Sequence, residues 1–164
     1  AITAPCAFVS AGGAAIIGII AGVLVVYSVF FFDKIGVDDC VGAISVHGTN
    51  GLWGVLSVGF FANGEYGANY NGVTRIIDGA PHGVIGLFYG GGASQLLAQC
   101  CEAVGIFILG FGIMYPFFKL SNLILPLRVS RDVELQGLDL PEMGAMGYPD
   151  FELKTTPSFS EISH

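Results

Sequence analysis

Long stretches without charge constrain this chain more than any other feature of its sequence. No Asp, Glu, Lys or Arg interrupts the runs from Ala11 to Phe32 and from Val41 to Ala62. Since a helix rises about 1.5 Å per residue, roughly 20 apolar residues cross the hydrocarbon core of a bilayer. A third run, from Ala93 to about Leu125, has a helical period and is interrupted by Glu102 and Pro116. The sequence therefore predicts an all-α membrane protein with three transmembrane helices.

The composition excludes several classes of function. Of the 164 residues, 53% are hydrophobic and only 12% are charged, whereas about a quarter of the residues of a soluble domain are charged. The net charge is -7, and the six Lys and Arg residues are scattered, which excludes a nucleic-acid surface. No nucleophile–base pair or phosphate loop indicates an enzyme. The cysteines lack C-x-x-C spacing and are predicted to be small buried hydrophobic residues. They are Cys6, Cys40, Cys100 and Cys101.

A polar segment, residues 63–92, separates the second predicted span from the third. Its turn signals predict an ordered loop outside the membrane. They are the pairs Asn63-Gly64, Asn71-Gly72 and Asp78-Gly79. With the spans at about 11–32, 41–62 and 93–125, this loop makes residues 1–127 the predicted transmembrane region.

Residues 128–164 form a predicted tail in which acidic residues outnumber basic ones and apolar residues are too few for independent folding. Lys and Arg are enriched in cytoplasmic loops, so their distribution predicts the orientation. Lys34 lies in the first connection and most others follow the third span, whereas Arg75 alone lies in the outer loop. The sequence therefore predicts a multi-pass protein of the cell (inner or plasma) membrane with a cytoplasmic C-terminus.

Two helix faces stand out within the predicted spans. On the first span, Ala14, Gly18 and Gly22 recur at every fourth position, a spacing that permits close approach of another helix, although a glycine-rich span also produces it by chance. On the third span, a polar stripe is expected to satisfy a polar group on a neighbouring helix or subunit, with a role in conduction as the alternative. Its residues are Gln95, Gln99 and Glu102.

A single histidine inside the second span is the most informative residue. An imidazole in an apolar span is costly, so His47 marks either a solute pathway or a structural hydrogen bond to a neighbouring carbonyl. By the helical period, His47 shares a face with small and polar residues, among them Asn50 and Gly51, that suit a narrow lumen. No second His, Cys or carboxylate follows one turn away, so the number of ligands is too small for a metal site.

The residues around His47 resemble a motif of a known transport family. The run from Asp38 to Gly54, DDCVGAISVHGTNGLWG, resembles the second pore-histidine helix of the Amt ammonium transporters, commonly D-D-P-x-x-x-x-x-V-H-G-x-x-G-x-x-G. Residues 1–9 look like the end of the preceding helix in that family. Gly137-Leu138-Asp139 resembles the G-L-D of its cytoplasmic tail. The resemblance covers essentially the whole chain, in order and spacing.

The resemblance implies an eleven-helix protomer with an inverted repeat of two five-helix halves, assembled as a homotrimer with one pore per subunit. This chain would supply the last three helices and the tail. His47 then corresponds to the second of two facing pore histidines, and Asn50 and Gly51 lie beside it on the pathway of ammonium or ammonia. Gly137, Leu138 and Asp139 correspond to the tail segment that couples the pores, from whose side a PII-type signal protein blocks some members. No cofactor is implied.

Other interpretations stay open from the sequence. An Amt-like module can sense ammonium, and a three-span piece can be a non-conducting structural membrane subunit. The motifs do not distinguish gas conduction from electrogenic transport. The chain lacks an initiator Met and a signal peptide, so we expect it to be the C-terminal part of something longer. It departs from the family pattern at Cys40 (usually Pro), Gly42 (often Asp) and Met143 (often His).

Overall fold

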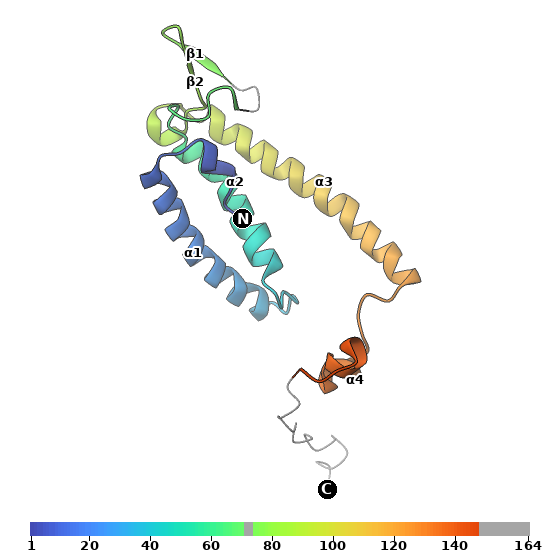
Figure 1. Ribbon diagram of the computed structural model, residues 1–164. Helices are drawn as coiled ribbons and strands as arrows, with labels where there is room; N and C mark the ends of the chain where they lie inside the picture. Colours follow the sequence, from blue (N-terminus) through green and yellow to red (C-terminus); the bar gives the residue numbers. More distant parts are fainter. Residues whose placement is uncertain (71–73, 148–164) are drawn as a thin grey trace. The chain divides into compact units, whose positions relative to one another are not determined.

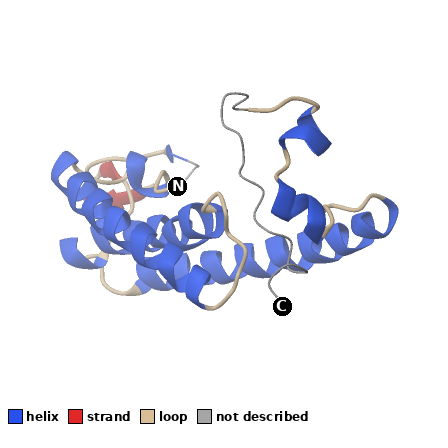
Figure 2. Ribbon diagram, turned by 90° about the horizontal axis from the view of Figure 1, so that it is seen from below, coloured by secondary structure: helices blue, strands red, loops and turns tan. Residues whose placement is uncertain are grey.

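A computed structural model describes residues 1–70 and 74–147, and helices dominate these residues (Figures 1 and 2). The chain divides into two units, Ala1–Ile113 and Met114–His164. In the first unit the elements are η1 (Ala4–Ala7), α1 (Ala11–Lys34), η2 (Ile44–Thr49), α2 (Asn50–Phe61), β1 (Arg75–Ile77), β2 (Ala80–His82), η4 (Leu87–Tyr89) and the start of α3 (Ser94–Ile124). The second unit contains the end of α3, α4 (Arg131–Gln136) and η5 (Asp139–Met143).

Helix α1 begins at Ala11, where the first apolar run begins. The Ser10 hydroxyl accepts a hydrogen bond from the backbone N–H of Gly13 at 3.3 Å and caps the helix start. The helix continues to Lys34, two residues beyond the predicted end of the span. A lysine in the last turn is favourable because the helix dipole is negative there.

Among the described residues, two helices are long and apolar enough to cross a membrane: α1, with 24 residues, and α3, with 31 residues. The second apolar run forms two shorter helical segments in series. The first, η2, is π-helical and the second, α2, is α-helical. This change of helix type matters because η2 contains His47.

Helix α1 packs against α2 through a face one residue removed from the predicted one. The buried residues of α1 are Gly13, Ile17, Ala21 and Ser28. A Cβ atom at Gly18 or Gly22 would meet no other atom within 4 Å. The indole Nε1 of Trp53 on α2 donates a hydrogen bond to the carbonyl of Ile17 at 3.1 Å, which helps to fix the observed face. The predicted small-residue face is therefore not the one that packs within the described residues.

Residues 63–92 contain a small antiparallel sheet in which Arg75 of β1 lies opposite His82 of β2. The strands are joined by Asp78-Gly79, whose φ angles are 52° and 80°. Positive φ at both central residues is the signature of a two-residue type I′ hairpin turn, so this turn signal is confirmed. At the Asn63-Gly64 pair, Asn63 forms an isolated bridge with Ile85. The predicted turn at Asn71-Gly72 lies outside the described residues.

The C-terminal end of α2 anchors both residues 63–92 and α3. Val58, Ala62 and Val84 form a small buried cluster against which Phe8 packs. A Cβ atom at Gly59 would lie 2.6 Å from the Cα atom of Leu96. Only glycine permits α3 to approach α2 this closely at that point.

The described part of the second unit ends at residue 147. Arg128 and Glu134 form an ion pair of 2.7 Å, and the Ser130 hydroxyl caps α4 by accepting from the N–H of Val133 at 3.5 Å. The predictions for residues 148–164 of the tail lie outside the described residues.

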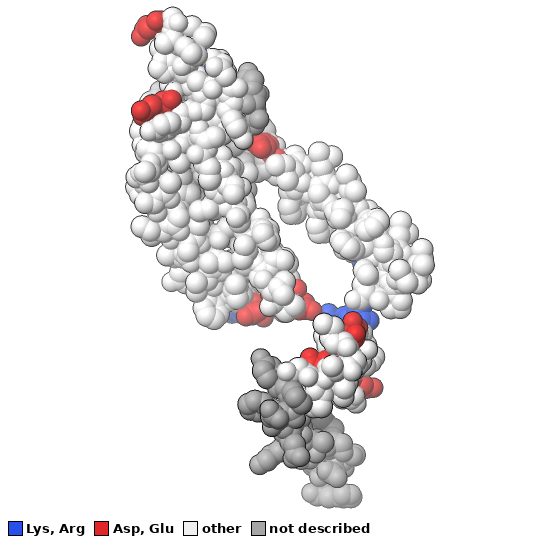
Figure 3. All heavy atoms as spheres, in the orientation of Figure 1, with Lys and Arg blue, Asp and Glu red and all other residues white. Residues whose placement is uncertain are grey.

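The first unit exposes many large hydrophobic side chains, and Figure 3 shows few charged residues on the face that it draws. The cysteines are exposed as well: Cys6, Cys40, Cys100 and Cys101 are free and exposed. The prediction that they are buried is wrong, because an apolar residue on a helix is buried only where a neighbouring element covers that face. Helix α3, which carries two of the cysteines, has no buried residue in the described structure.

Candidate functional site

His47 lies within η2, the π-helical turn Ile44–Thr49. In this turn the backbone N–H of Asn50 donates to the carbonyl of Ser45, five residues earlier. Such turns are rare and occur frequently at functional sites. The His47 side chain is exposed, and no hydrogen bond to its imidazole is formed by residues 1–70 or 74–147. The alternative was a structural histidine bonded to a neighbouring carbonyl. No carbonyl in the described part of the chain forms that hydrogen bond with His47.

The π turn changes which residues share a face with His47. An α-helix turns by about 100° per residue, and a wider π turn holds nearly one residue more. Asn50, predicted on the His47 face from the α-helical period, is only 7% exposed. Gly51 is half-buried. The structure therefore does not bring His47 and Asn50 together on one open face.

Asn50 is a buried polar residue at the start of α2. Its side-chain Oδ1 has no hydrogen-bond partner among the described residues. A buried acceptor without a partner costs roughly 1–3 kcal/mol. Asn50 therefore retains a carbonyl oxygen that can still accept a hydrogen bond.

Asp39 holds the start of η2 and was not singled out as a site residue from the sequence. Its carboxylate accepts hydrogen bonds from the backbone N–H groups of Ile44 at 2.8 Å and Ser45 at 3.0 Å, and from the Ser45 hydroxyl at 2.9 Å. Desolvation raises the pKa of Asp39, but these hydrogen bonds to the charged form outweigh it and hold the pKa below its ordinary value. The sequence feature that could have identified Asp39 is the Asp38-Asp39 pair that precedes the second apolar run.

We expect Asp39→Ala to lower the melting temperature of the purified chain near neutral pH, because the start of η2 loses its acceptor. The folded-state pKa is lowered, so the charge contributes stability above the unfolded pKa of about 3.9. That contribution is lost as the pH falls through the lower folded value. The difference between wild type and Asp39→Ala should therefore shrink in acid. Asp39→Asn, which retains an acceptor oxygen, should be less destabilised, and a pH-independent difference would contradict the assignment.

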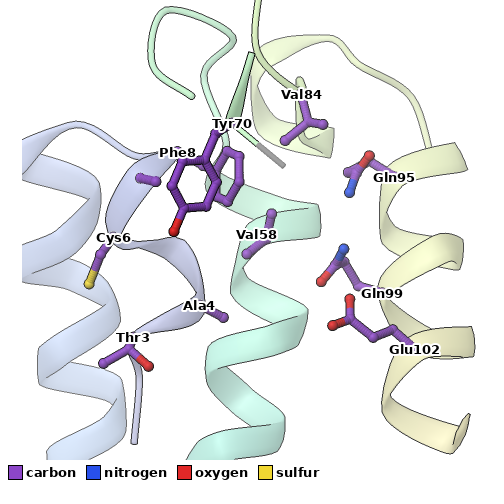
Figure 4. A pocket seen from close by; sticks show the side chains of 11 residues that line it. Thr3, Ala4, Cys6, Phe8, Val58, Tyr70, Val84, Gln95, Gln99 and Glu102 are labelled. Carbon is purple, nitrogen blue, oxygen red and sulfur yellow. The ribbon is translucent and has the colours of Figure 1, made fainter. Parts of the chain in front are cut away.

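The polar stripe of α3 lines a cavity of about 500 Å³ in the first unit. Figure 4 shows Gln95, Gln99 and Glu102 projecting toward it, opposite residues of the N-terminal segment, α2 and the loop. With the Gln99 amide nitrogen turned toward α2, it donates to the Val55 carbonyl at 3.0 Å and to Glu102 Oε2 at 3.2 Å. In that orientation its oxygen accepts from Gln95 Nε2 at 3.1 Å. The stripe thus satisfies a polar group on a neighbouring helix, as expected, and His47 does not line this cavity.

Gly137 follows α4 with φ 96° and ψ 152°. Residues other than glycine adopt this combination of φ and ψ only with strain. The backbone conformation therefore accounts for the glycine at position 137. Its N–H donates to the Val133 carbonyl at 3.0 Å. Leu138 is exposed, and the Asp139 carboxylate accepts a hydrogen bond from the N–H of Gly147 at 3.0 Å. Within residues 1–70 and 74–147, no three His, Cys, Asp or Glu side chains could hold a metal ion.

The described residues combine long apolar helices with a histidine on a π-helical turn in an uncharged run, which are features typical of a membrane-embedded protein. Residues 1–148 match the Ammonium Transporter Family. The chain belongs to this family, and the resemblance drawn from the His47 motif is confirmed. It is a family of membrane-embedded transporters and not of enzymes.

Curated relatives agree with this membership. The chain is 38% identical over 151 residues to the ammonium transporter Amt2 of Archaeoglobus fulgidus, covering 92% of this chain and 30% of that protein. It is 34% identical over 151 residues to an ammonium transporter of Bacillus subtilis, and the match covers 92% of this chain and 34% of that protein. It is 32% identical over 148 residues to ammonium transporter 1 member 1 of Solanum lycopersicum, and the match covers 90% of this chain and 29% of that protein. The chain thus spans about a third of the length of these relatives.

Proposed function

We propose that this chain forms the C-terminal part of an ammonium transporter and contributes His47 as one of two pore histidines. The observation that carries the proposal is the setting of His47. Its imidazole is exposed and unbonded in the described residues, although the backbone that bears it is held by Asp39. A side chain kept available on a fixed backbone suits a solute pathway better than a purely structural role.

The chemistry follows from the cost of carrying a cation through an apolar lumen. Removing ammonium from water costs several kcal/mol or more, whereas neutral ammonia loses little. A selective pore therefore benefits from taking the proton off at the entrance. A neutral imidazole donates a hydrogen bond from one ring nitrogen and accepts one at the other, so His47 and a facing histidine can relay a proton. Asn50 is buried and does not share the open face of His47, so we assign it no contact with the solute. Gly51 leaves space for the passage of the solute.

The proposal includes the surroundings of the pore. The three helical stretches near residues 11–34, 44–61 and 94–124 cross the membrane within an eleven-helix inverted repeat, with residues 63–92 outside and residues 128–164 in the cytoplasm. The scattered positive charges support this orientation. The exposed apolar side chains of α3 support further helices or lipid around it. Protomers assemble as homotrimers, and the segment Gly137-Leu138-Asp139 couples their pores and lies where a PII-type protein binds.

The test compares the full-length polypeptide with residues 1–164 alone, each reconstituted in proteoliposomes. An imposed ammonium gradient should alkalinise the interior or generate a current only with the full-length protein, because three helices do not enclose a two-repeat pore. Empty liposomes supply the background rate, and an excess of potassium tests selectivity. Selective flux from residues 1–164 alone would contradict the proposed contribution. Absence of ammonium flux with the folded full-length protein would contradict transport and favour a sensor or structural subunit.

A further inference from the structure

The π turn that carries His47 is held at its far end as well as at its start. The hydroxyl oxygens of Ser28 on α1 and Thr49, the last residue of η2, lie 2.7 Å apart and share a hydrogen bond. Ser28 is only 7% exposed. Because a buried hydroxyl without a partner is costly, the Ser28 side chain favours the arrangement in which it meets Thr49, which is partly buried.

A turn of this kind needs such contacts in order to persist. A π-helical turn is rare compared with an α-helical one, so neighbouring contacts decide whether the wider turn forms. If residues 44–49 returned to the α-helical register, the segment before the turn would rotate by about 100° relative to α2, the angle contributed by one residue. His47 lies inside the turn itself, so the direction of its side chain depends on the register.

We propose that Ser28 and Thr49 are positioning residues for His47. The hydroxyl pair ties the end of η2 to α1, while Asp39 holds its beginning through Ile44 and Ser45. These two attachments fix the turn on both sides of His47, whose imidazole forms no bond of its own to the described residues. The inference rests on the proposed function of His47 as a pore residue. It assigns the direction of the imidazole to a contact between helices that lies outside the His47 motif itself.

The structure offers a matched control for the loss of a buried hydroxyl. Ser57 is also buried, and its hydroxyl donates to the Gly54 carbonyl at 2.7 Å within α2. Ser57→Ala therefore removes a buried hydroxyl from the same helical stretch without touching the attachment to α1. Thr49→Ser keeps the hydroxyl that Thr49→Val removes, and the valine side chain preserves the branched shape of threonine.

The experiment places Ser28→Ala, Thr49→Val, their double variant, Thr49→Ser and Ser57→Ala in the full-length protein in proteoliposomes. Ammonium flux is measured alongside the imidazole nitrogen NMR signal of His47, which is identified by its absence in His47→Ala. We expect Ser28→Ala and Thr49→Val each to shift this signal and to reduce flux about tenfold, since small misplacements of a reacting group are costly. The double variant should be no worse than either single variant. Thr49→Ser and Ser57→Ala should behave as wild type.

The outcomes separate this inference from the proposed function. If His47→Ala abolishes flux but Ser28→Ala and Thr49→Val leave both the imidazole signal and flux unchanged, the positioning role is wrong and the pore role stands. If the two variants shift the signal while His47→Ala leaves flux unchanged, the positioning is real and the pore function is wrong. An equal shift of the His47 signal in Ser57→Ala would also overturn the inference, because any lost hydroxyl would then have the same effect.

Discussion

Replacing His47 with Ala in the full-length protein is expected to reduce ammonium-driven flux by about a hundredfold or more, the usual contribution of a positioned proton-transfer group. The imidazole supplies the nitrogen atoms needed to relay a proton between two histidines, and alanine supplies none. The amount of folded protein should change little, because the side chain is exposed and forms no hydrogen bond within the described residues. The measurement is internal alkalinisation of proteoliposomes that contain matched amounts of folded protein.

The chain provides a control histidine outside the helices. His82 lies on β2 opposite Arg75, away from the apolar stretch that contains His47. His82→Ala should therefore retain flux close to that of the wild type. If His47→Ala keeps wild-type flux and unchanged discrimination against potassium, His47 is structural and the relay is wrong.

The second large effect concerns the tail. Gly137→Asp in the full-length protein should lower flux even in assemblies that also contain wild-type subunits. At φ 96° and ψ 152° a side chain strains the backbone, at a cost of about 1–3 kcal/mol. A Cβ atom there would meet nothing within 4 Å, so the effect arises from the backbone and not from a clash. The strained segment leads directly into Leu138 and Asp139, which we propose contact the cytoplasmic loops of the same and neighbouring subunits.

The measurement is flux as a function of the fraction of mutant protomers in co-expressed mixtures. If one altered tail closes every pore of a trimer, an equal mixture retains about one-eighth of the wild-type flux, whereas independent pores retain about half. A linear decline would therefore reject coupling through the tail. Gly137→Ala separates backbone strain from the added charge. Gly112→Ala serves as a tolerated glycine replacement, because Gly112 lies in α3 with open space around its Cβ position and no positive φ.

Several features of the site escaped prediction because they depend on contacts and backbone geometry that residue type and α-helical spacing do not encode. The hydroxyls of Ser28 and Thr49 belong to different helices, and neither residue is unusual in an apolar run. The carboxylate of Asp39 reaches forward to Ile44 and Ser45, a contact that depends on the bend of the chain between α1 and η2. Periodicity also missed the π turn, because one extra residue in a turn leaves the composition of the run unchanged.

The sequence by itself determined the local properties. Uninterrupted apolar runs predicted helices because their length and hydrophobicity are features of consecutive residues, and Asp78-Gly79 predicted its turn through the φ angles that these residues tolerate. The spacing around His47 identified the family. The tertiary structure alone decided which face of α1 is buried, since Trp53 donates to Ile17 and the face of Gly18 stays open. The tertiary structure alone also placed Asn50 away from the open face of His47. The register of the helix at this point depends on contacts with neighbouring helices, which the order of residues within the helix does not reveal.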